Sequence, residues 1–458
     1  MAPLLAAVIL CAGKGTRMKS AQAKVLHPLL GRPLFSYAVE LAQSVGASPI
    51  VVVVGHQAAE VRAAVAAQGS SAPIRFAIQK EQRGTGHAVL CAQIELTQHR
   101  GPVLILYGDV PLLSAQTLHA LRAAYARAKA PLALVATHRE QPFGYGRLVR
   151  KGGRVARVVE ERDCTPAQAK IREVNAGIYL VDSAFLWESL RQVKGHNAQG
   201  ELYLTDVVER AARKGEVGVV NADVAETMGV NDRVELAEAG ALLRARINGE
   251  HMRAGVTLVD PHSTFIAPDC EIAPDCVIGP SVSLSAVQLE AGVRVDQGCV
   301  LSRVRVGERT HLKPYSVAED AVIGRECKVG PFAHLRPGTV LANQVHLGNF
   351  VETKKTRLGT GAKANHLSYL GDAEIGASVN IGAGTITCNY DGVHKHPTRI
   401  DAGAFIGSDT QLVAPVTVGA GAYVGAGTTV TQDVPAGSLA LSRVPQVVKK
   451  NWAKKKGR

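Results

Sequence analysis

A repeat of six residues constrains the C-terminal half of this 458-residue chain. Aliphatic residues recur at this spacing, and the residue after the aliphatic is often glycine. The three runs are Ile266, Ile272, Ile278 and Leu284; Val317, Ile323, Val329, Leu335, Leu341 and Leu347; and Ile400, Ile406, Leu412, Val418, Val424 and Val430. A period of six fits neither a helix nor an ordinary strand, but it is the period of a hexapeptide parallel β-helix. We therefore expect a prism of about 18 residues per coil, with the aliphatic side chains inside.

Two segments interrupt this repeat. One lies between Leu347 and Ile375, and the other covers residues 387–399. Solenoids extrude insertions as loops on one face, which is commonly the binding face. We therefore expect both segments to be loops that belong to a functional site. Their polar and aromatic residues include Asn365, His366, Tyr369, Asn389, Tyr390 and Asp391.

Composition narrows the class of protein. A low aromatic content (4%) with 46 glycines suits a core of small aliphatic residues. The net charge of +13 suits anionic ligands, but no arginine–aromatic pattern typical of nucleic-acid binding is present. We expect the basic C-terminal run to be a solvated end. Eight cysteines without a C-x-x-C pair favour reduced thiols in a cytoplasmic protein, and no segment is long enough for membrane insertion.

The N-terminal half alternates short apolar runs with helical patterns. The apolar runs are residues 6–10, 50–54, 103–107 and 132–137, and helical patterns cover 34–45 and 118–128. The first run is read as a buried strand and not as a signal segment, because a glycine-rich loop replaces a cleavage site. Alternating βα units predict a parallel sheet covered on both faces, with ligands at the carboxyl ends of its strands.

Two loops lie at such strand ends. The first strand leads into Gly13-Lys14-Gly15-Thr16-Arg17-Met18, whose glycines and cations suit a phosphate. A third glycine at Met18, needed for a dinucleotide fingerprint, is absent, and so is a Walker A motif. The second loop, Tyr107-Gly108-Asp109, places an aspartate where it can hold a divalent cation. Alternatively, Asp109 is a helix cap or turn residue.

These motifs resemble those of a known family. The segment from Leu10 to Lys24 resembles the signature of sugar-1-phosphate nucleotidyltransferases, and Gln82 with residues 84–88 resembles their base-binding segment. With the run 382–392 in the repeat, the whole chain is similar to the bifunctional N-acetylglucosamine-1-phosphate uridyltransferases and glucosamine-1-phosphate N-acetyltransferases. Cys11, where alanine is usual, and Ala23, where proline is usual, depart from the signature. Neither departure removes a charged group.

The resemblance implies a first site for uridyl transfer from UTP. Arg17 and Lys24 would offset the charge of the phosphates, and Asp109 with Asn231 would ligate Mg²⁺. The nucleotide residues would be Leu10, Ala12, Gly13, Lys24, Gln79, Gly84, Thr85, Tyr107, Gly108 and Asp109. The residues for N-acetylglucosamine-1-phosphate would be Gly144, Glu160, Asn175 and Asn231. A simpler reading makes Glu160 a surface ion-pair partner of Arg162, and Asn175 a turn residue.

The resemblance also implies a second site for acetyl transfer from acetyl-CoA to glucosamine-1-phosphate. An ammonium cannot attack a thioester, so a base must take its proton, and His366 is the candidate. Its alternative is a surface histidine. Arg336, Lys354, Tyr369 and Asn380 would bind glucosamine-1-phosphate. Ala383, Asn389, Tyr390, Ser408, Ala426 and Arg443 would bind acetyl-CoA. We read His394 and His396 as loop residues and not as metal ligands.

The implied organisation is a Rossmann-like α/β nucleotidyltransferase domain (1–232), a linker helix (233–253) and a left-handed parallel β-helix (254–458). The helical spacing of 233–253 independently predicts that helix. The family forms homotrimers with shared acetyl-transfer sites and makes a precursor of peptidoglycan and lipopolysaccharide. Two other hypotheses stay open: a nucleotidyltransferase with one reaction and a regulatory β-helix, such as a glucose-1-phosphate enzyme, and a binding scaffold without catalysis.

Overall fold

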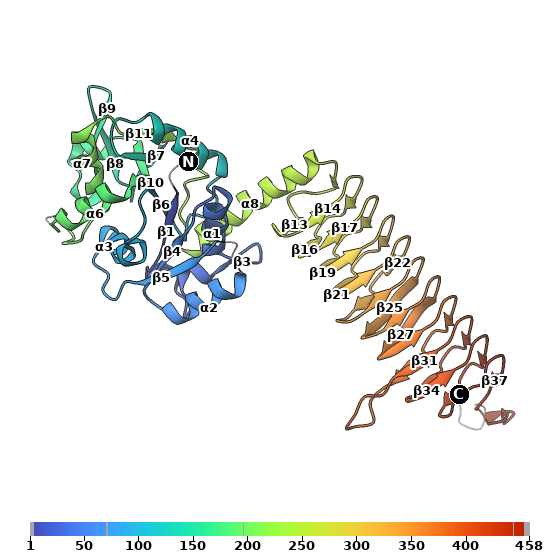
Figure 1. Ribbon diagram of the computed structural model, residues 1–458. Coiled ribbons are helices and arrows are strands. Elements are labelled where there is room, and N and C mark those ends of the chain that lie inside the picture. Colours follow the sequence, from blue (N-terminus) through green and yellow to red (C-terminus); the bar gives the residue numbers. More distant parts are fainter. Residues whose placement is uncertain (1–3, 70–71, 196, 443, 453–458) are drawn as a thin grey trace. The chain divides into compact units, whose positions relative to one another are not determined.

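The computed structural model describes residues 4–69, 72–195, 197–442 and 444–452. These residues form two compact units, Met1–Leu243 and Arg244–Arg458 (Figure 1). The helix predicted over 233–253 is present as α8 (Arg233–Arg253), and the boundary between the units falls within it. Asp232 caps this helix, because its Oδ1 accepts hydrogen bonds from the N–H groups of Val234 and Glu235, both at 2.9 Å. Among the described residues, no helix is both long and apolar enough to cross a membrane.

The first unit is an α/β fold. Its strands are β1 (Ala6–Cys11), β2 (Pro28–Leu29), β3 (Arg32–Pro33), β4 (Ile50–Val54), β5 (Ile74–Ile78), β6 (Pro102–Tyr107), β7 (Leu132–His138), β8 (Arg147–Lys151), β9 (Arg154–Val159), β10 (Glu173–Asp182) and β11 (Gly218–Asn221). Its helices are α1 (Leu34–Ser44), α2 (Ala58–Gln68), α3 (Thr85–Cys91), α4 (Ala115–Arg127), α5 (Pro166–Ala169), α6 (Ser183–Gln192) and α7 (Asp206–Lys214). The strands and helices predicted from periodicity are therefore confirmed.

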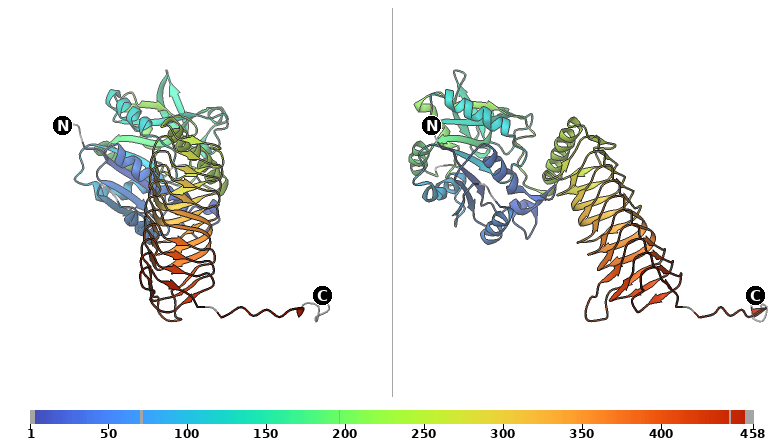
Figure 2. Two further views of the ribbon diagram at one scale, coloured as in Figure 1. Left: turned by 90° about the vertical axis from the view of Figure 1, so that its right-hand side faces the viewer. Right: turned by 45° about the vertical axis from the view of Figure 1, so that its right-hand side comes forward.

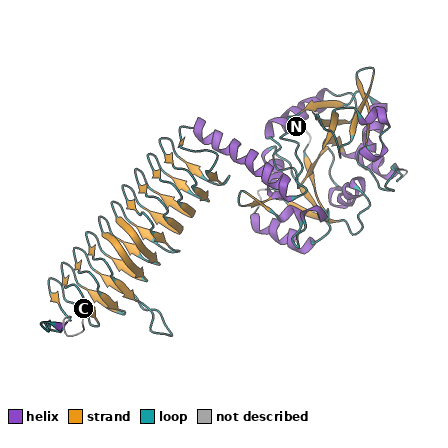
Figure 3. Cartoon of the chain, turned by 180° about the vertical axis from the view of Figure 1, so that it is seen from behind, coloured by secondary structure: helices purple, strands orange, loops and turns teal. Residues whose placement is uncertain are grey.

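The main sheet of this unit has the strand order β11-β7-β10-β6-β1-β4-β5. The predicted parallel pairing is present between β1 and β4, β1 and β6, and β4 and β5, but β10, which was not predicted, inserts antiparallel between β6 and β7. A β8–β9 hairpin precedes β10 and returns the chain to the sheet in the opposite direction. Consecutive residues of β1 contribute alternately to two hydrophobic clusters, so the sheet is buried on both faces. Figure 3 shows helices on both sides of it.

The second unit is a parallel β-helix. From β12 (Thr257–Leu258) to β37 (Leu439–Ala440), the described strands pair in parallel with strands of the next coil. Figure 2 shows this stack of coils from two sides. Most strands have two residues, and the longer ones are β16 (Ser283–Ser285), β19 (Val300–Val306), β21 (Val317–Ile323), β25 (His346–Lys354), β27 (Lys363–Gly371), β28 (Ala373–Ile375), β30 (Ile386–Cys388), β31 (Thr398–Ile400), β33 (Gln411–Val413) and β34 (Val416–Val418).

The aliphatic residues of the repeat lie inside the prism as predicted, with two exceptions. Ile272 is half-buried, and Val317 is 37% exposed. Val317 pairs with Val300, 17 positions earlier, whereas Tyr423 pairs with Phe405, 18 positions earlier. A coil that is one residue shorter turns Val317 outward and Ala318 inward, because neighbouring side chains in a strand point to opposite faces.

Only one of the two interruptions is a loop. The segment that contains Lys354 and His366 was predicted to be extruded, and this prediction is wrong. Both residues lie in paired strands, β25 and β27. His346 pairs with Lys363, 17 positions on, so this coil lost a residue and gained no insertion.

The second interruption is a loop as predicted. Thr398 pairs with Ala373, 25 positions earlier, and the extra residues form a hairpin with an antiparallel bridge between Tyr390 and Lys395. This hairpin projects from the stack beside β31 (Figure 1).

Close stacking of coils makes Gly348 irreplaceable. A β-carbon at Gly348 would lie 1.7 Å from the carbonyl oxygen of Asn365 in the next coil. We expect Gly348→Ala to destabilise the β-helix by about 3 kcal/mol or more, because backbone atoms must move apart. Urea unfolding followed by circular dichroism measures this loss.

Gly240→Ala in α8 is the matched control, because its β-carbon would meet only Leu29 Cδ1 at 3.6 Å. It should be neutral, or stabilising by up to about 1 kcal/mol. Equal unfolding midpoints for the two variants would contradict the stacking argument.

Candidate active sites

A pocket of about 460 Å³ opens at the carboxyl ends of β1 and β6 in the first unit. Eight residues predicted for the first site line it: Arg17, Thr85, Tyr107, Asp109, Gly144, Glu160, Asn175 and Asn231. They come from sequence positions more than 200 residues apart. The fold therefore gathers the residues of the glycine-rich loop, of the aspartate loop and of the sugar-phosphate set around one cavity.

A cluster of three polar side chains lies at this strand edge. The Lys24 ammonium donates to the Asp109 carboxylate and, at 3.1 Å, to Asn231 Oδ1. Lys24 reaches them because Gly15 has no side chain: a β-carbon there would lie 2.6 Å from Lys24 Cβ. The backbone N–H of Asn231 donates to Glu235 Oε2 at 2.6 Å, which fixes the asparagine at the start of α8.

The two predicted metal ligands fit a hard cation. Asp109 and Asn231 supply a carboxylate and an amide oxygen that converge on one point, since both accept from the same ammonium. Mg²⁺ is commonly held by one or two such protein oxygens, with phosphates and water completing its shell. Among the described residues, no group of three or more His, Cys, Asp or Glu side chains could hold a metal ion. The pair thus suits a metal that is shared with a phosphate ligand.

Glu160 forms the acidic wall of the pocket. It follows β9, and its Oε1 accepts a hydrogen bond from Thr205 Oγ1 at 2.9 Å. Burial raises the pKa of the Glu160 carboxyl, while the bond from Thr205 opposes that rise. Burial and the nearby charges of Glu160 and Asp109 raise the pKa of the Tyr107 hydroxyl. Glu160 is therefore part of the pocket, and it is Glu161 that forms an ion pair, with the buried Arg147 at 2.6 Å.

Asn175 lies within β10 and is not a turn residue. It is 8% exposed, and its Nδ2 donates to the hydroxyl of Tyr179 at 2.5 Å. Its Oδ1 is buried and has no hydrogen-bond partner. Buried amide oxygens are costly when unpaired, so this atom is a candidate acceptor for a ligand hydrogen bond.

The other predicted nucleotide residues surround the same strand ends without lining the pocket. Gly108 N–H donates to the carbonyl of Leu10 at 3.0 Å, and Gln82 Nε2 donates to the carbonyl of Ala12 at 2.8 Å. Gln79 Nε2 donates to the carbonyl of Gly84 at 3.1 Å. Gly13 is exposed, with nothing within 4 Å of where its β-carbon would be. These contacts tie the glycine-rich loop to the base-binding segment.

The two departures from the family signature fit the structure. Cys11 is buried, and a β-carbon on Gly108 would lie 2.5 Å from its Sγ. Burial, followed by the charge of Asp109, raises the pKa of this thiol, so it stays protonated. Ala23 has φ of −55°, a value that proline also adopts. Each departure therefore preserves the local backbone.

Several residues of this pocket were missed by sequence reasoning, and three of them carry polar side chains that bear on the site. Glu235, Thr205 and Tyr145 line it beside the predicted set. Thr205 and Tyr145 belong to no motif, so nothing in the sequence marks them. Glu235 stands in the first turn of the predicted helix, four positions after Asn231. This spacing, one helical turn from a predicted site residue, was the only pattern in the sequence that pointed to Glu235.

In the second unit, His366 is an exposed residue of β27 that pairs with Asn349. The next coils stack directly beneath it: Gly384 N–H donates to the carbonyl of Leu367 (2.8 Å), Asp409 N–H to Ala383 (2.7 Å) and Gly427 N–H to Ser408 (2.8 Å). The predicted residues His366, Ala383, Ser408 and Ala426 therefore occupy successive coils along one edge of the prism. The predicted Arg443 lies outside the described residues.

Cations cluster at the end of β25. Arg336 pairs with Glu352 at 2.7 Å. The ammonium of Lys395 in the hairpin, and then the guanidinium of Arg336, lower the pKa of Lys354, while Asp372 opposes them. This crowding of positive charge is what a phosphate dianion would relieve. Sequence reasoning missed Lys395 and Asp372, since neither belongs to the repeat.

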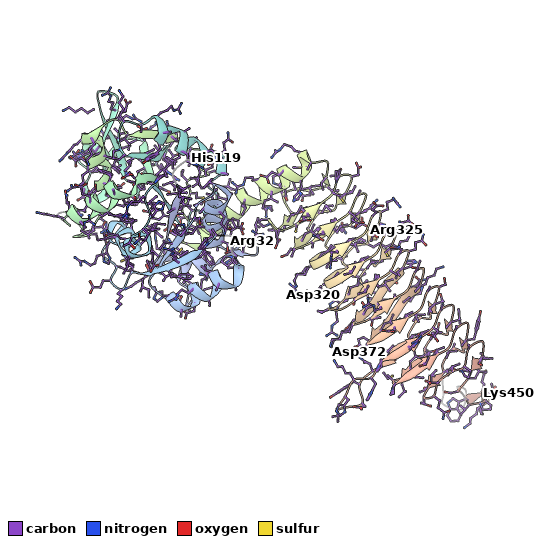
Figure 4. The ribbon with its side chains drawn as sticks, in the orientation of Figure 1. Arg32, His119, Asp320, Arg325, Asp372 and Lys450 are labelled. Carbon is purple, nitrogen blue, oxygen red and sulfur yellow. The ribbon has the colours of Figure 1, made fainter. Side chains whose placement is uncertain are left out.

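The hairpin is anchored at its base and exposed at its tip. Asn389 is buried, and its Nδ2 donates to the Asp372 carboxylate (Figure 4 labels Asp372). Tyr390 is exposed and donates its hydroxyl to the carbonyl of Gly392 at 2.6 Å. His396 Nε2 lies 2.7 Å from Asp391 Oδ2. These bonds hold the hairpin rigidly over the end of β27.

In the strand register, Tyr369 lies between His366 and the position that pairs with Lys354, whereas Asn380 lies on the other side of His366. Tyr369 pairs with Glu352, and its hydroxyl covers Gly371, where a β-carbon would lie 2.5 Å from it. Asn380 pairs with Lys363 of the preceding coil. Strand β27 thus links the edge that carries His366 to the cations around Lys354.

Comparisons with known proteins match both units. The model of a MobA-like NTP transferase domain matches residues 7–204, and that of a GMPPB C-terminal domain matches residues 261–358. The chain is 54% identical over 450 residues to the bifunctional protein GlmU of Anaeromyxobacter sp. (strain Fw109-5), covering 98% of this chain and 92% of the relative.

Two further relatives agree. The chain is 52% identical over 452 residues to bifunctional protein GlmU of Pelobacter propionicus, covering 98% of each chain. It is 47% identical over 478 residues to that of Geobacter sulfurreducens, covering 99% of each. The chain therefore belongs to the GlmU family of bifunctional enzymes, and it carries the uridyltransferase and N-acetyltransferase activities of UDP-N-acetylglucosamine synthesis.

Proposed function

We propose that residues 254–458 acetylate glucosamine-1-phosphate with acetyl-CoA. Residues 1–232, joined to them by the helix 233–253, then transfer the uridylyl group of UTP to the N-acetylglucosamine-1-phosphate formed, and pyrophosphate leaves. The observation that carries this proposal is the convergence of Lys24, Asp109 and Asn231 beside a pocket with an acidic wall. That arrangement can neutralise phosphates on one side and accept sugar hydroxyl groups on the other.

In uridyl transfer, the phosphate oxygen of the sugar attacks the α-phosphorus of UTP in line, so two polyanions must approach. Arg17 lines the pocket and Lys24 lies behind it, where both would offset this repulsion and the charge of departing pyrophosphate. Glu160 and Asn175 would orient the sugar through its hydroxyl and amide groups. No protein nucleophile is needed.

Mg²⁺ is the proposed cofactor of this half. Asp109 and Asn231 would hold it, and the bound ion would supply positive charge that offsets the charge of the phosphates. Lys24 contacts both ligand oxygens, so its ammonium would turn toward the phosphates when the ion is bound. Glu235 would keep Asn231 in position throughout.

In acetyl transfer, the amine of glucosamine-1-phosphate attacks the thioester carbonyl; a C–N bond forms, the C–S bond breaks and the CoA thiol leaves. His366 would accept the proton of the amine and pass it to the departing CoA sulfur. Arg336 and Lys354 would hold the phosphate, with Tyr369 and Asn380 beside the sugar. Acetyl-CoA would follow the edge formed by Ala383, Ser408 and Ala426 toward Arg443, with Asn389 and Tyr390 over its acetyl end.

We also propose a homotrimer in the cytoplasm. The exposed positions of His366 and Tyr390 support the homotrimer, because a second chain would complete the wall of the acetyl-transfer site. Free thiols at Cys91, Cys164 and the other cysteines support a reducing compartment. UTP and acetyl-CoA are cytoplasmic metabolites, and the UDP-N-acetylglucosamine formed there would serve peptidoglycan and lipopolysaccharide synthesis.

Asp109→Ala should lower uridyl transfer by about 10²–10³-fold, because it removes a carboxylate that acts in the transition state. Release of pyrophosphate from UTP and N-acetylglucosamine-1-phosphate measures this step. Acetyl transfer should stay at its original rate, and Asp223→Ala, an exposed carboxylate of the same unit, should change neither. Near-normal pyrophosphate release by Asp109→Ala at low Mg²⁺ would refute the metal role.

The uridyltransferase half should work alone when α8 is kept. A chain shortened to end at Arg253 should retain uridyl transfer and lose both acetyl transfer and trimer formation, as activity assays and light scattering would show. A chain that ends at Asp232 lacks Glu235, which fixes Asn231, so it should require more Mg²⁺. If the chain ending at Arg253 still released CoA in the presence of glucosamine-1-phosphate, the assignment of two separate sites would be wrong.

His366→Ala should have the opposite effect. Loss of a general base typically slows the reaction about 10²–10⁴-fold, and an exposed histidine can be removed without opening the core. CoA release should fall by this factor while uridyl transfer and the trimer persist. His262→Ala, an exposed histidine of the first coil, is the control and should be silent. If the His366→Ala variant forms a trimer and still acetylates at a rate within a few-fold of the parent, His366 is a surface histidine and not the base.

A further inference from the structure

Five basic residues occupy one strand column on the outside of the β-helix, which we call the basic column: Arg294, His311, Lys328, His346 and Lys363. Each pairs in register with the next: Arg294 with His311, His311 with Lys328, Lys328 with His346, and His346 with Lys363. Their strands are β18 (Arg294–Val295), β20 (His311–Leu312), β22 (Lys328–Val329), β25 and β27, and Figure 1 shows the last three one after another along the stack.

Only the first two members have an acidic partner. Asp296 accepts from Arg294 at 2.8 Å and lies 2.7 Å from His311 Nε2. In the part of the chain that the structure describes, no carboxylate forms an ion pair with Lys328, His346 or Lys363. Paired strands are about 4.8 Å apart, so these three side chains project from one surface as an uncompensated basic group.

The surroundings of His346 confirm how closely these charges approach. Burial lowers the pKa of its imidazole, and the positive groups Lys313, Lys328, Lys363 and His366 lower it further. The lowered pKa leaves His346 neutral near pH 7, so the fixed charges here are the ammonium groups of Lys328 and Lys363, with the imidazole between them. Two like charges without an acidic partner repel each other, which is a disadvantage in the empty protein. A bound anion would remove this disadvantage.

Two arginines of the same β-helix, Arg303 and Arg309, are compensated along the ladder. Arg303 pairs with Glu319 and Asp320 of the next coil, and Arg309 pairs with Glu326. Cations alternate with acids there, which makes the run from Lys328 to Lys363 exceptional among these neighbours. The contrast shows that this fold can neutralise stacked cations where no ligand is needed.

The basic column ends beside the candidate base. Lys363 begins β27, and His366 lies three residues later in the same strand. Phosphate groups are the natural ligands of such a cluster, because one phosphate can accept from several ammonium groups. Several rungs in line suit a ligand with more than one phosphate.

We propose that the basic column binds the phosphate groups of an acetyl-transfer substrate and raises the rate at which that substrate reaches His366. This inference rests on the proposed acetyl-transfer site. Its ligand class is a phosphate-bearing anion, with acetyl-CoA or glucosamine-1-phosphate as its source. During this approach, before the substrate settles in the site described above, a monoester would engage one lysine, whereas acetyl-CoA would engage Lys328 and Lys363 through more than one of its phosphates.

Direct binding tests the column without relying on activity. Tripolyphosphate is titrated into the full-length oligomer by calorimetry, using the parent, Lys328→Gln/Lys363→Gln, and the control Arg325→Gln/Arg357→Gln. The control removes two exposed arginines elsewhere on the same prism (Figure 4 labels Arg325). At about 50 mM salt we expect the lysine variant to bind about tenfold more weakly than the control, and at about 500 mM salt the difference should disappear. Equal binding by the two variants would overturn the proposal.

Kinetics then identify the source of the phosphate. The lysine variant should lower kcat/KM of acetyl transfer about tenfold at low salt with kcat unchanged, and uridyl transfer should not change. If kcat/KM falls when acetyl-CoA is the varied substrate, acetyl-CoA is the ligand. If it falls when glucosamine-1-phosphate is varied, the sugar phosphate is the ligand.

Two outcomes would overturn the proposal in this assay. One is a defect of equal size at both salt concentrations. The other is a variant with an altered oligomeric state on size exclusion, because the column would then be an assembly surface. A parent that binds tripolyphosphate but shows no acetyl transfer would refute the proposed function and leave the anion site intact.

Discussion

Backbone pairing between consecutive coils determines most of what the second unit can do. Because each strand pairs in parallel with the strand one coil later, a residue's neighbours in space are the residues 17 or 18 positions away, or 25 positions away across the hairpin. Inside the prism this pairing stacks aliphatic side chains; outside, it stacks whatever the sequence supplies. His366, Ala383 and Ser408 follow one another for this reason, and so do Lys328, His346 and Lys363. The same rule excludes a side chain at Gly348, where the next coil leaves no room.

The first unit reaches its chemistry by a different route. Its site residues come from loops that follow separate strands, and the sheet brings their ends together. Lys24 is central because it contacts both Asp109 and Asn231, which are 122 positions apart in the sequence. Burial of Glu160 and Tyr107 places poorly solvated polar groups opposite these charges. The pocket therefore has a cationic side and a poorly solvated polar side.

Local patterns in the sequence were enough to predict the two folds and the residues at the strand ends. The apolar run of β1 and the inward position of Ile406 follow from periodicity alone. The direction of β10 does not follow from periodicity, because an apolar or alternating pattern does not tell which way a strand runs in the sheet. A shift of the six-residue repeat likewise does not reveal whether a residue was added or lost, so the coil that contains His366 was mistaken for an extruded loop.

Contacts between distant segments were the other gap. Thr205 touches Glu160 and Lys395 approaches Lys354, yet neither belongs to a motif that would mark it. The family resemblance supplied residues that physical patterns could not, such as Asn231 and Tyr369. It did not supply Tyr179 or Asp372, which orient the named residues from behind.

The hairpin that projects at residues 389–397 lengthens one coil without changing how the strands on either side of it pair. The strands on either side of it, β30 and β31, pair normally with β33 and β34 of the following coil. The interior of the prism therefore does not sense the size of the projection. A protein engineer could exchange this segment for another of different length, keeping Asn389 and Asp372 as its anchor, while the scaffold stays as it is.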